Sequence, residues 1–243
     1  MNEPQGRRGG ASKAPLTRQL IVDSALKLIT ERGFNALTMR SLAQELETGP
    51  AALYVYFKNR QSLVDTLINT VLSEVEIHNA EGDMAWDAQL EALAMRTVES
   101  LVRYPGLSAG MVGRVPSAEA LLRISERYLK ILLDSSHDEM TSLLAVDVLN
   151  SIVITEANEI SAFEATLGKE HLYEAENVLS GLDPENFPHL SRLSHMAMIA
   201  TPVERAQWAI QTFIRGLAQT SVPVQCPIKD SRSTTDGLLH EPT

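Results

Sequence analysis

The chain has 243 residues, of which 44% are hydrophobic, 21% charged and only 5% aromatic, and its net charge is −10. Its many Leu and Ala residues favour helices over a β-sandwich, and the absence of an uninterrupted apolar run near the roughly 20 residues of a membrane span argues against a membrane protein. A single cysteine, Cys226, excludes an intrachain disulfide and a multi-cysteine metal site, and with no secretory signal in view we expect a cytoplasmic protein.

Charge is unevenly distributed along the chain. Residues 1–62 hold nine Lys and Arg against five Asp and Glu, a balance of +4. The remaining residues hold twelve Lys and Arg against twenty-six Asp and Glu, a balance of −14. A basic N-terminal unit on an acidic body is typical of a head that binds a polyanion and a body that regulates it.

The first elements in chain order are short helices. Residues 1–15 have no periodicity and are expected to form a disordered basic arm. Thr17 is a candidate N-cap for a helix that ends at Gly33, where a helix C′ residue would adopt a positive φ. Thr38 begins a second helix that reaches residue 46, and Gly49 and Pro50 begin a third over 50–56.

Asn59 is the candidate cap of a fourth helix that runs to about residue 76, with Leu63, Leu67 and Val71 repeating every four residues. Two short helices separated by residues 47–49 and packed on a longer first helix are the arrangement of a helix-turn-helix. The sequence therefore predicts a helix-turn-helix domain over 16–62.

Residues 63–220 are expected to form a larger helical domain. Further helices are predicted over 83–104, 117–133, 138–168 and 203–220. Between them, 106–116 is irregular, and 169–200 has the Gly and Pro content of a loop with short helical turns. The composition of 221–243 is typical of a disordered tail. Since no segment has the pattern of a strand, the predicted fold class is all-α.

The head resembles a known family. The stretches "ALKLITERGFNALTMRSLAQEL" and "TGPAALYVYFKNRQSLVDTL" make residues 17–77 similar to the N-terminal domain of the TetR family of transcriptional repressors. In the body, Trp86, "YPGL" at 104–107 and "VGRVP" at 112–116 resemble the subgroup related to the tetracycline repressor. Family members often have Gly at the end of the second helix, where this chain has Glu47, so we expect Gly49 to supply the flexibility of the turn.

The short third helix has the chemistry of a DNA-reading element. Pro50, Ala51 and Ala52 are small enough to let it approach the backbone and base edges, and an alanine methyl can contact a thymine methyl. Leu53 and Phe57, four residues apart, should face the core of the head.

Tyr54 and Tyr56 lie on different faces, so one can pack inward while the other reaches outward. The resemblance implies that both contact the DNA backbone.

Polar and basic residues flank this helix. Lys58 and Arg60, near the N-terminus of the fourth helix, are expected to clamp a phosphate. Thr38 can bond a phosphate, cap its own helix or do both, and the resemblance puts Arg40 at a base-contacting position, where the alternative is a surface salt bridge. The full set of expected DNA contacts is Thr38, Arg40, Thr48, Gly49, Pro50, Ala51, Ala52, Tyr54, Val55, Tyr56, Lys58 and Arg60.

The resemblance implies a homodimeric repressor that binds a pseudo-palindromic operator with recognition helices roughly 34 Å apart and is released by a small molecule. Two apolar stripes suit either a four-helix dimer interface or an ordinary core. One covers 143–154, and the other, on the last helix, comprises Ala206, Ala209, Ile210, Phe213 and Leu217. A pocket for a mainly apolar ligand is expected among the helices of the body, with five candidate residues: Met95, Met111, Arg114, Asn150 and Glu156.

An enzyme is the first alternative class, but the chain has no nucleophile elbow, phosphate loop or histidine pair at metal-ligand spacing. No catalytic residue, cofactor or metal is therefore expected. The second alternative is a regulator of the same fold that activates transcription or answers a protein partner instead of a small molecule.

Overall fold

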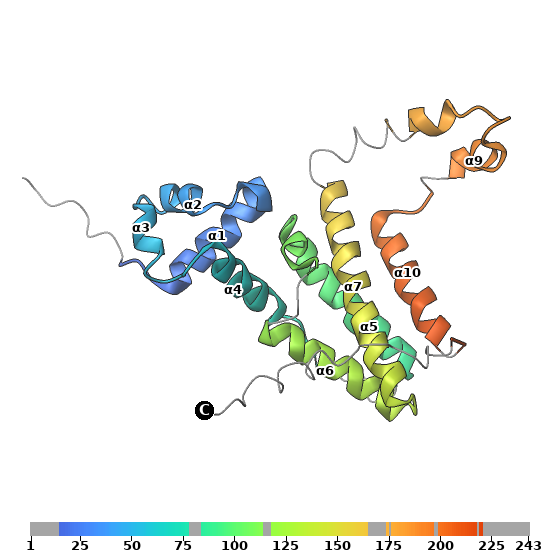
Figure 1. Ribbon diagram of the computed structural model, residues 1–243, viewed down its shortest axis with the longest axis horizontal. Helices are drawn as coiled ribbons and strands as arrows, with labels where there is room; N and C mark the ends of the chain where they lie inside the picture. The colour runs from blue at the N-terminus through green and yellow to red at the C-terminus, as the bar shows by residue number, and fades with distance from the viewer. Residues whose placement is uncertain are drawn as a thin grey trace, which may run out of the picture.

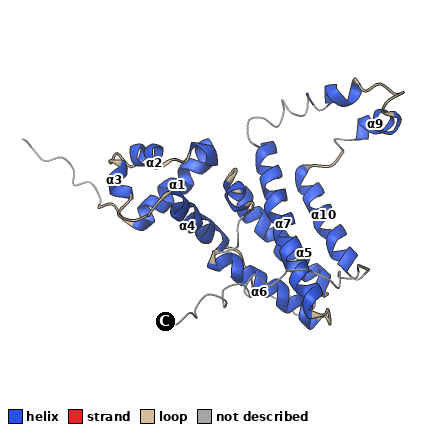
Figure 2. Ribbon diagram, viewed as in Figure 1, coloured by secondary structure: helices blue, strands red, loops and turns tan. Residues whose placement is uncertain are grey.

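The computed structural model describes residues 15–77, 84–113, 118–164, 174, 176–196, 199–217 and 219–220. The regular elements in these residues are all helices, as Figure 2 shows, and no strand occurs among them. Figure 1 shows a head built from α1 to α4 and a larger body built around α5, α6, α7 and α10. The prediction of an all-α chain with a helix-turn-helix head is confirmed. The predicted arm and tail lie almost wholly outside the described residues.

The head begins with α1, which spans Arg18–Arg32. The Thr17 side chain accepts a hydrogen bond from the Leu20 amide and so satisfies one of the N–H groups that a helix start leaves without a partner. The helix ends at Gly33, whose φ of 76° is one that glycine adopts without steric cost. Both ends agree with the sequence prediction. A 3₁₀ turn, η1 (Phe34–Ala36), then leads to the next helix.

The helix-turn-helix consists of α2 (Met39–Glu45) and α3 (Pro50–Leu53). Thr38 and Ser41 form a reciprocal capping box that fixes the start of α2. Gly49 and Pro50 begin α3 at the predicted positions, but the helix ends at Leu53, earlier than expected, and residues 54–56 form a turn.

The backbone of the turn between α2 and α3 differs from the prediction. Glu47 has a φ of 48°, in the left-handed region, whereas Gly49 has a φ of −83° and is extended. The expectation that Gly49 supplies the flexibility is therefore wrong, because the left-handed residue is Glu47 itself. A residue with a Cβ atom adopts that conformation at a cost of about 1–2 kcal/mol.

Helix α4 (Arg60–Leu72) joins the head to the body. Asn59 caps it in a capping box with Ser62, as predicted. It ends before the predicted residue 76, because the amides of Glu74 and Val75 bond to carbonyls three residues back and tighten the chain into turns. It packs against α1 on one side and against α5 and α6 on the other.

Two hydrogen bonds fix α4 to the body. The Ser100 hydroxyl of α5 donates to the Val71 carbonyl at 3.0 Å. The Ala120 amide of α6 donates to Asn69 Oδ1 at 2.9 Å. The two parts of the molecule therefore share a helix, and no linker separates them.

The body is arranged around α7 (Glu139–Glu164), which packs against α5 (Trp86–Val102), α6 (Glu119–Asp134) and α10 (Pro202–Leu217). The Asp138 carboxylate accepts hydrogen bonds from the Thr141 hydroxyl at 2.6 Å and the Thr141 amide at 3.0 Å, and these lower the pKa of Asp138 below its ordinary value. Within the described residues α7 alone is long and apolar enough to cross a membrane, and 39% of its apolar window is buried inside the body. It serves here as the central core helix.

The stripe predicted on the last helix is divided by the fold. Ala206 and Ile210 are fully buried within the single chain, so they belong to its own core and the interface interpretation is wrong for these two. Ala209, Phe213 and Leu217 remain half-buried.

A segment between α7 and α10 carries α9 (Pro188–Leu193) and the 3₁₀ turn η3 (Ser194–Met196). In Figure 1 it stands away from the helices of the body. Four of its apolar side chains are 43–56% exposed: Phe187, Leu190, Leu193 and Met196.

Candidate nucleic-acid interface and ligand cavity

The tip of the head exposes apolar side chains that a core would normally cover. Tyr54 is 51% exposed and Val55 is 80% exposed, at the end of α3. Lys58 lies in the same turn region and is also exposed. Leu53 and Phe57 point the other way and are buried, as predicted, because they are four residues apart. One side of this short segment thus anchors it, and the other side is open to a partner.

The start of α2 and the leading residues of α3 add to this exposed surface. Thr38 and Arg40 are exposed. The Thr38 side chain also caps α2, so capping and a phosphate contact are compatible at this position. Gly49, Pro50 and Ala51 are exposed, whereas Thr48 and Ala52 are half-buried.

Two other cations of the head are paired. Lys27 and Arg32 each approach the Glu45 carboxylate at 3.6 Å. Among the described residues, Arg40 and Lys58 form no ion pair. Positive charge that is open to an anion is therefore present on α2 and in the segment after α3.

Tyr56 is turned toward α1. Its hydroxyl donates a hydrogen bond to the Leu16 carbonyl, just before the first helix. Arg18 holds the same segment: its Nη1 donates to the Tyr56 carbonyl at 2.9 Å, and its guanidinium carbon lies 4.3 Å from the centre of the Phe57 ring. Sequence reasoning missed this role of Arg18, because only the fold brings residues 18 and 56 together.

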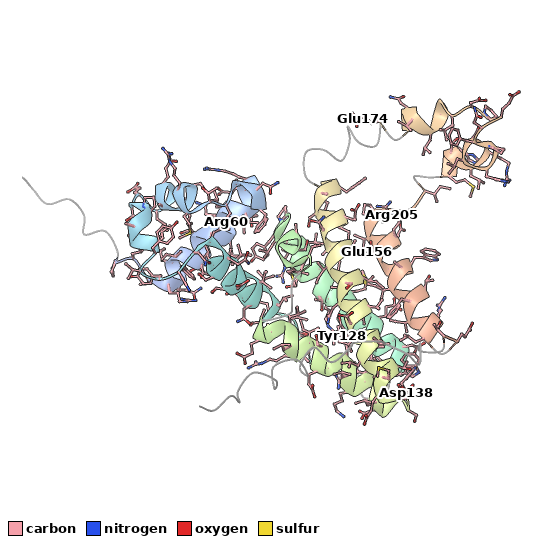
Figure 3. All side chains as sticks on the ribbon, viewed as in Figure 1. Arg60, Tyr128, Asp138, Glu156, Glu174 and Arg205 are labelled. Atoms are coloured by element: carbon pink, nitrogen blue, oxygen red, sulfur yellow. The ribbon has the colours of Figure 1, made fainter. Side chains whose placement is uncertain are left out.

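Arg60 does not stand beside Lys58 as an outward clamp. Its Nε donates to the Leu37 carbonyl at 2.7 Å and its guanidinium carbon lies 4.7 Å from the centre of the Phe34 ring. Figure 3 labels it in the head, where its side chain is half-buried. The predicted two-residue phosphate clamp is therefore corrected: in this arrangement Arg60 ties α4 to η1, since its half-buried side chain finds carbonyl and aromatic partners there.

The body contains a cavity of about 480 Å³ next to α4. Its wall combines apolar residues with carboxylate, amide and hydroxyl groups. The lining residues that matter below are Asp65, Ile68, Gly110, Met111, Asp147, Asn150, Ser151 and Thr155. They come from α4, from the 3₁₀ turn η2 (Leu107–Met111) and from α7. A space of this size suits a small organic molecule.

The five residues predicted for ligand binding separate in the fold. Met111 and Asn150 line the cavity, and the Asn150 amide donates to Ser125 Oγ at 2.9 Å. Met95 packs against the core on α5 instead. Arg114 lies outside the described residues.

Glu156 lies on the side of α7 that faces α10, as Figure 3 shows, and not in the cavity wall. Burial raises the pKa of its carboxyl above the ordinary value. The Arg205 guanidinium opposes that rise, and the Glu159 carboxylate adds to it.

Three polar lining residues were missed, although a signal for them exists. Asp147, Ser151 and Thr155 repeat every four residues along the largely apolar middle of α7, so they form one polar row. Asp65 and Ile68 could not be found in this way, because their place in the wall depends on how α4 meets the body. No cluster of His, Cys, Asp and Glu suited to a metal ion occurs within the described ranges.

Comparison with known proteins gives two consecutive family matches. Residues 21–67 match the family described as "Bacterial regulatory proteins, tetR family". Residues 78–220 match "Tetracyclin repressor-like, C-terminal domain".

Named relatives agree with these matches. The chain is 35% identical over 103 residues to the HTH-type transcriptional repressor DrrR1 of Streptomyces coeruleorubidus, a match that spans 42% of this chain and 38% of that repressor. It is 26% identical over 206 residues to the tetracycline repressor class D of Escherichia coli, covering 84% of this chain and 89% of that one.

Solved structures show the likeness over most of the chain. Apo ActR of Streptomyces coelicolor superposes with a TM-score of 0.71 at 29% identity and covers 85% of this chain and 98% of ActR. ActR in complex with actinorhodin superposes with a TM-score of 0.72 at 29% identity, covering 84% and 96%.

Proposed function

The chain belongs to the TetR family of transcriptional regulators, and from this premise we propose that it is a homodimeric repressor. Its two heads bind a pseudo-palindromic operator, and a small, mainly apolar molecule bound in the α4–η2–α7 cavity releases it. The observation that carries the proposal is the continuity of one helix, α4, between a DNA-reading head and the wall of a cavity.

The exposed surface of α2 and α3 supports DNA binding. Tyr54 and Val55 offer a hydroxyl and apolar contacts at the tip, and the uncompensated charges of Arg40 and Lys58 suit base edges and phosphates. A helix as short as α3 makes few base contacts, so phosphate contacts should supply most of the affinity. A single head would then bind weakly, which is a physical reason for a dimer.

A row of exposed apolar side chains supports dimerisation. Met140, Leu144 and Val148 lie four residues apart on α7 and are 41–55% exposed. On α10, which packs beside α7, Trp208 is 69% exposed. Two copies that paired these helices would cover the apolar area in a four-helix bundle.

The DNA-binding part is tested by gel shift with the DNA next to the protein's own gene. Binding should be specific and should weaken steeply as salt is added. Tyr54→Ala should abolish operator binding and leave the dimer intact in sedimentation, because its side chain is half exposed at the tip. An operator fragment that competes no better than random DNA would overturn the proposal. A monomeric Tyr54→Ala variant would mean that the tyrosine is structural.

The ligand part is tested with actinorhodin as the first probe, since a structure of the similar protein ActR contains it. A wider panel of apolar compounds with a few polar groups follows. A true effector should raise the melting temperature and release the operator at the same concentration. If no compound does both while a protein partner does, the regulator answers that partner instead.

A further inference from the structure

The 3₁₀ turn η2 is a thin wall between the cavity and the head. Gly110 and Met111 of this turn line the cavity. On the other side, a Cβ atom built on Gly110 would lie only 3.1 Å from Phe34 Cζ of the head and 3.1 Å from Val64 Cγ1 of α4. One at Gly106 would lie 3.1 Å from Phe34 Cβ. The Phe34 side chain therefore fills the space that two missing side chains leave, with its ring at Gly110 and its Cβ at Gly106.

Phe34 also has partners in both parts of the molecule. Its amide donates to the Pro105 carbonyl of the body at 3.0 Å, and the Arg60 guanidinium covers its ring. Arg60 also donates to the carbonyl of Leu37, which comes directly before the Thr38 cap of α2. A displacement of Phe34 is thus passed to the start of α2 and to the first residue of α4.

We propose that Phe34 and Gly110 form the joint through which occupancy of the cavity reaches the DNA-reading helices. This inference rests on the proposed release by a small molecule. A molecule that presses on Met111 and Gly110 moves η2 toward Phe34. Because no free space separates them, the ring and its Arg60 partner shift, and α2 and α3 change their orientation.

The joint can be tested without any effector. Gly110→Ala adds a methyl group that meets the Phe34 ring and so imitates the pressure of a ligand. We expect it to weaken operator binding by about tenfold, within the usual range of allosteric coupling. Phe34→Leu removes the Cζ atom that the methyl meets but leaves the contact with Val64, so the Gly110→Ala/Phe34→Leu double variant should regain part of the lost affinity.

Ala109→Ser is the matched control, because Ala109 is an exposed residue of the same 3₁₀ turn and does not line the cavity. It should bind the operator like the natural protein. Phe34→Trp enlarges the ring from the head side and should weaken binding as Gly110→Ala does, which provides a second route if the alanine variant does not fold. The rate of amide hydrogen exchange in residues 37–41 should rise in Gly110→Ala and should fall back toward the rate of the natural protein in the double variant.

The outcomes separate the joint from the proposed function. If the natural protein binds an operator and Gly110→Ala binds it equally well, the joint is refuted while the repressor stands. The joint also fails if the losses from Gly110→Ala and Phe34→Leu simply add in the double variant. If the natural protein prefers no operator, the repressor proposal fails, and the hydrogen-exchange pattern still decides whether η2 and α2 are coupled.

Discussion

Glu47 holds a left-handed backbone conformation at the point where the chain turns between α2 and α3. Replacing it by glycine removes the Cβ clash but makes the unfolded chain more flexible. The net effect of Glu47→Gly should be a gain of about 0.5–1 kcal/mol in the free energy of unfolding.

Glu47→Ala is the control for this substitution, because it removes the same carboxylate and keeps the Cβ atom. Urea unfolding of the two variants measures the backbone contribution directly. Equal stability of the glycine and alanine variants would show that the strain at Glu47 is no larger than the roughly 0.5–1 kcal/mol that glycine loses through the flexibility of the unfolded chain.

Lys58 and Arg60 are close in sequence but should respond differently to truncation. Lys58→Ala removes an exposed cation from each head, so we expect unchanged stability and, for the proposed dimer, a salt dependence of DNA binding that is shallower by about two units in the log–log slope. Arg60→Ala removes a hydrogen bond to the Leu37 carbonyl and the contact with Phe34, and should lower the free energy of unfolding by about 2 kcal/mol.

Thermal unfolding and salt titration of both variants check this pair of expectations. The opposite result, a destabilised Lys58→Ala and a stable Arg60→Ala with a shallower salt slope, would restore the phosphate clamp to Arg60.

At the scale of elements, the contact of α7 with α10 should depend on pH through Glu156. Its folded-state pKa is raised, first by burial, so the folded protein binds this proton more tightly than the unfolded chain. The resulting stability is fully present below the unfolded pKa near 4.5 and is lost as pH rises through the folded-state pKa.

Glu156→Gln should therefore raise the melting temperature at pH 7 and change it little at pH 4. The neighbouring Glu159→Gln, which removes only the like charge from an exposed position, should have a smaller effect at pH 7. Melting curves at both pH values measure the difference, and equal shifts at pH 4 and pH 7 would exclude titration of Glu156 as the cause.

The starts of the head helices were predictable because caps are local. Thr17, Thr38 and Asn59 each satisfy N–H groups within three residues, so the information lies in a few consecutive letters. Helix ends were harder: α3 and α4 stop early, since turn-type hydrogen bonds compete with the last helical ones.

The cavity was only partly predictable. Met111 and Asn150 were among the predicted residues, but their wall also needs Asp65 from a helix far away in the chain. The direction of the Arg60 side chain could not be predicted from the sequence either. A long side chain can reach several partners, and the position of Phe34 in the fold decides between them. Such facts belong to tertiary packing and leave no periodic trace in the sequence.

For the whole molecule, the exposed row on α7 predicts which substitution would disrupt the proposed dimer. Leu144→Glu puts a carboxylate into the proposed apolar interface, and an unpaired charge there costs several kcal/mol. We expect the dissociation constant to rise by at least about a hundredfold. Sedimentation at micromolar concentration measures this.

Leu122→Glu on α6 is the control, since that side chain is 51% exposed but lies on another helix. It should leave the dimer unchanged. If Leu144→Glu also remains dimeric, the partner copy does not cover this part of α7.

The direct fusion of head and body through α4 also limits the DNA that the protein can read. Hydrogen bonds of Ser100 and Asn69 fix α4 to the body, so no flexible linker lets the head rotate relative to the body. One base pair inserted at the centre of an operator rotates the far half-site by roughly 35° about the DNA axis. A head without a flexible linker cannot rotate by the same angle to reach it. Its binding sites in a genome should therefore differ in the base sequence of the central spacer, whereas the length of that spacer should be constant.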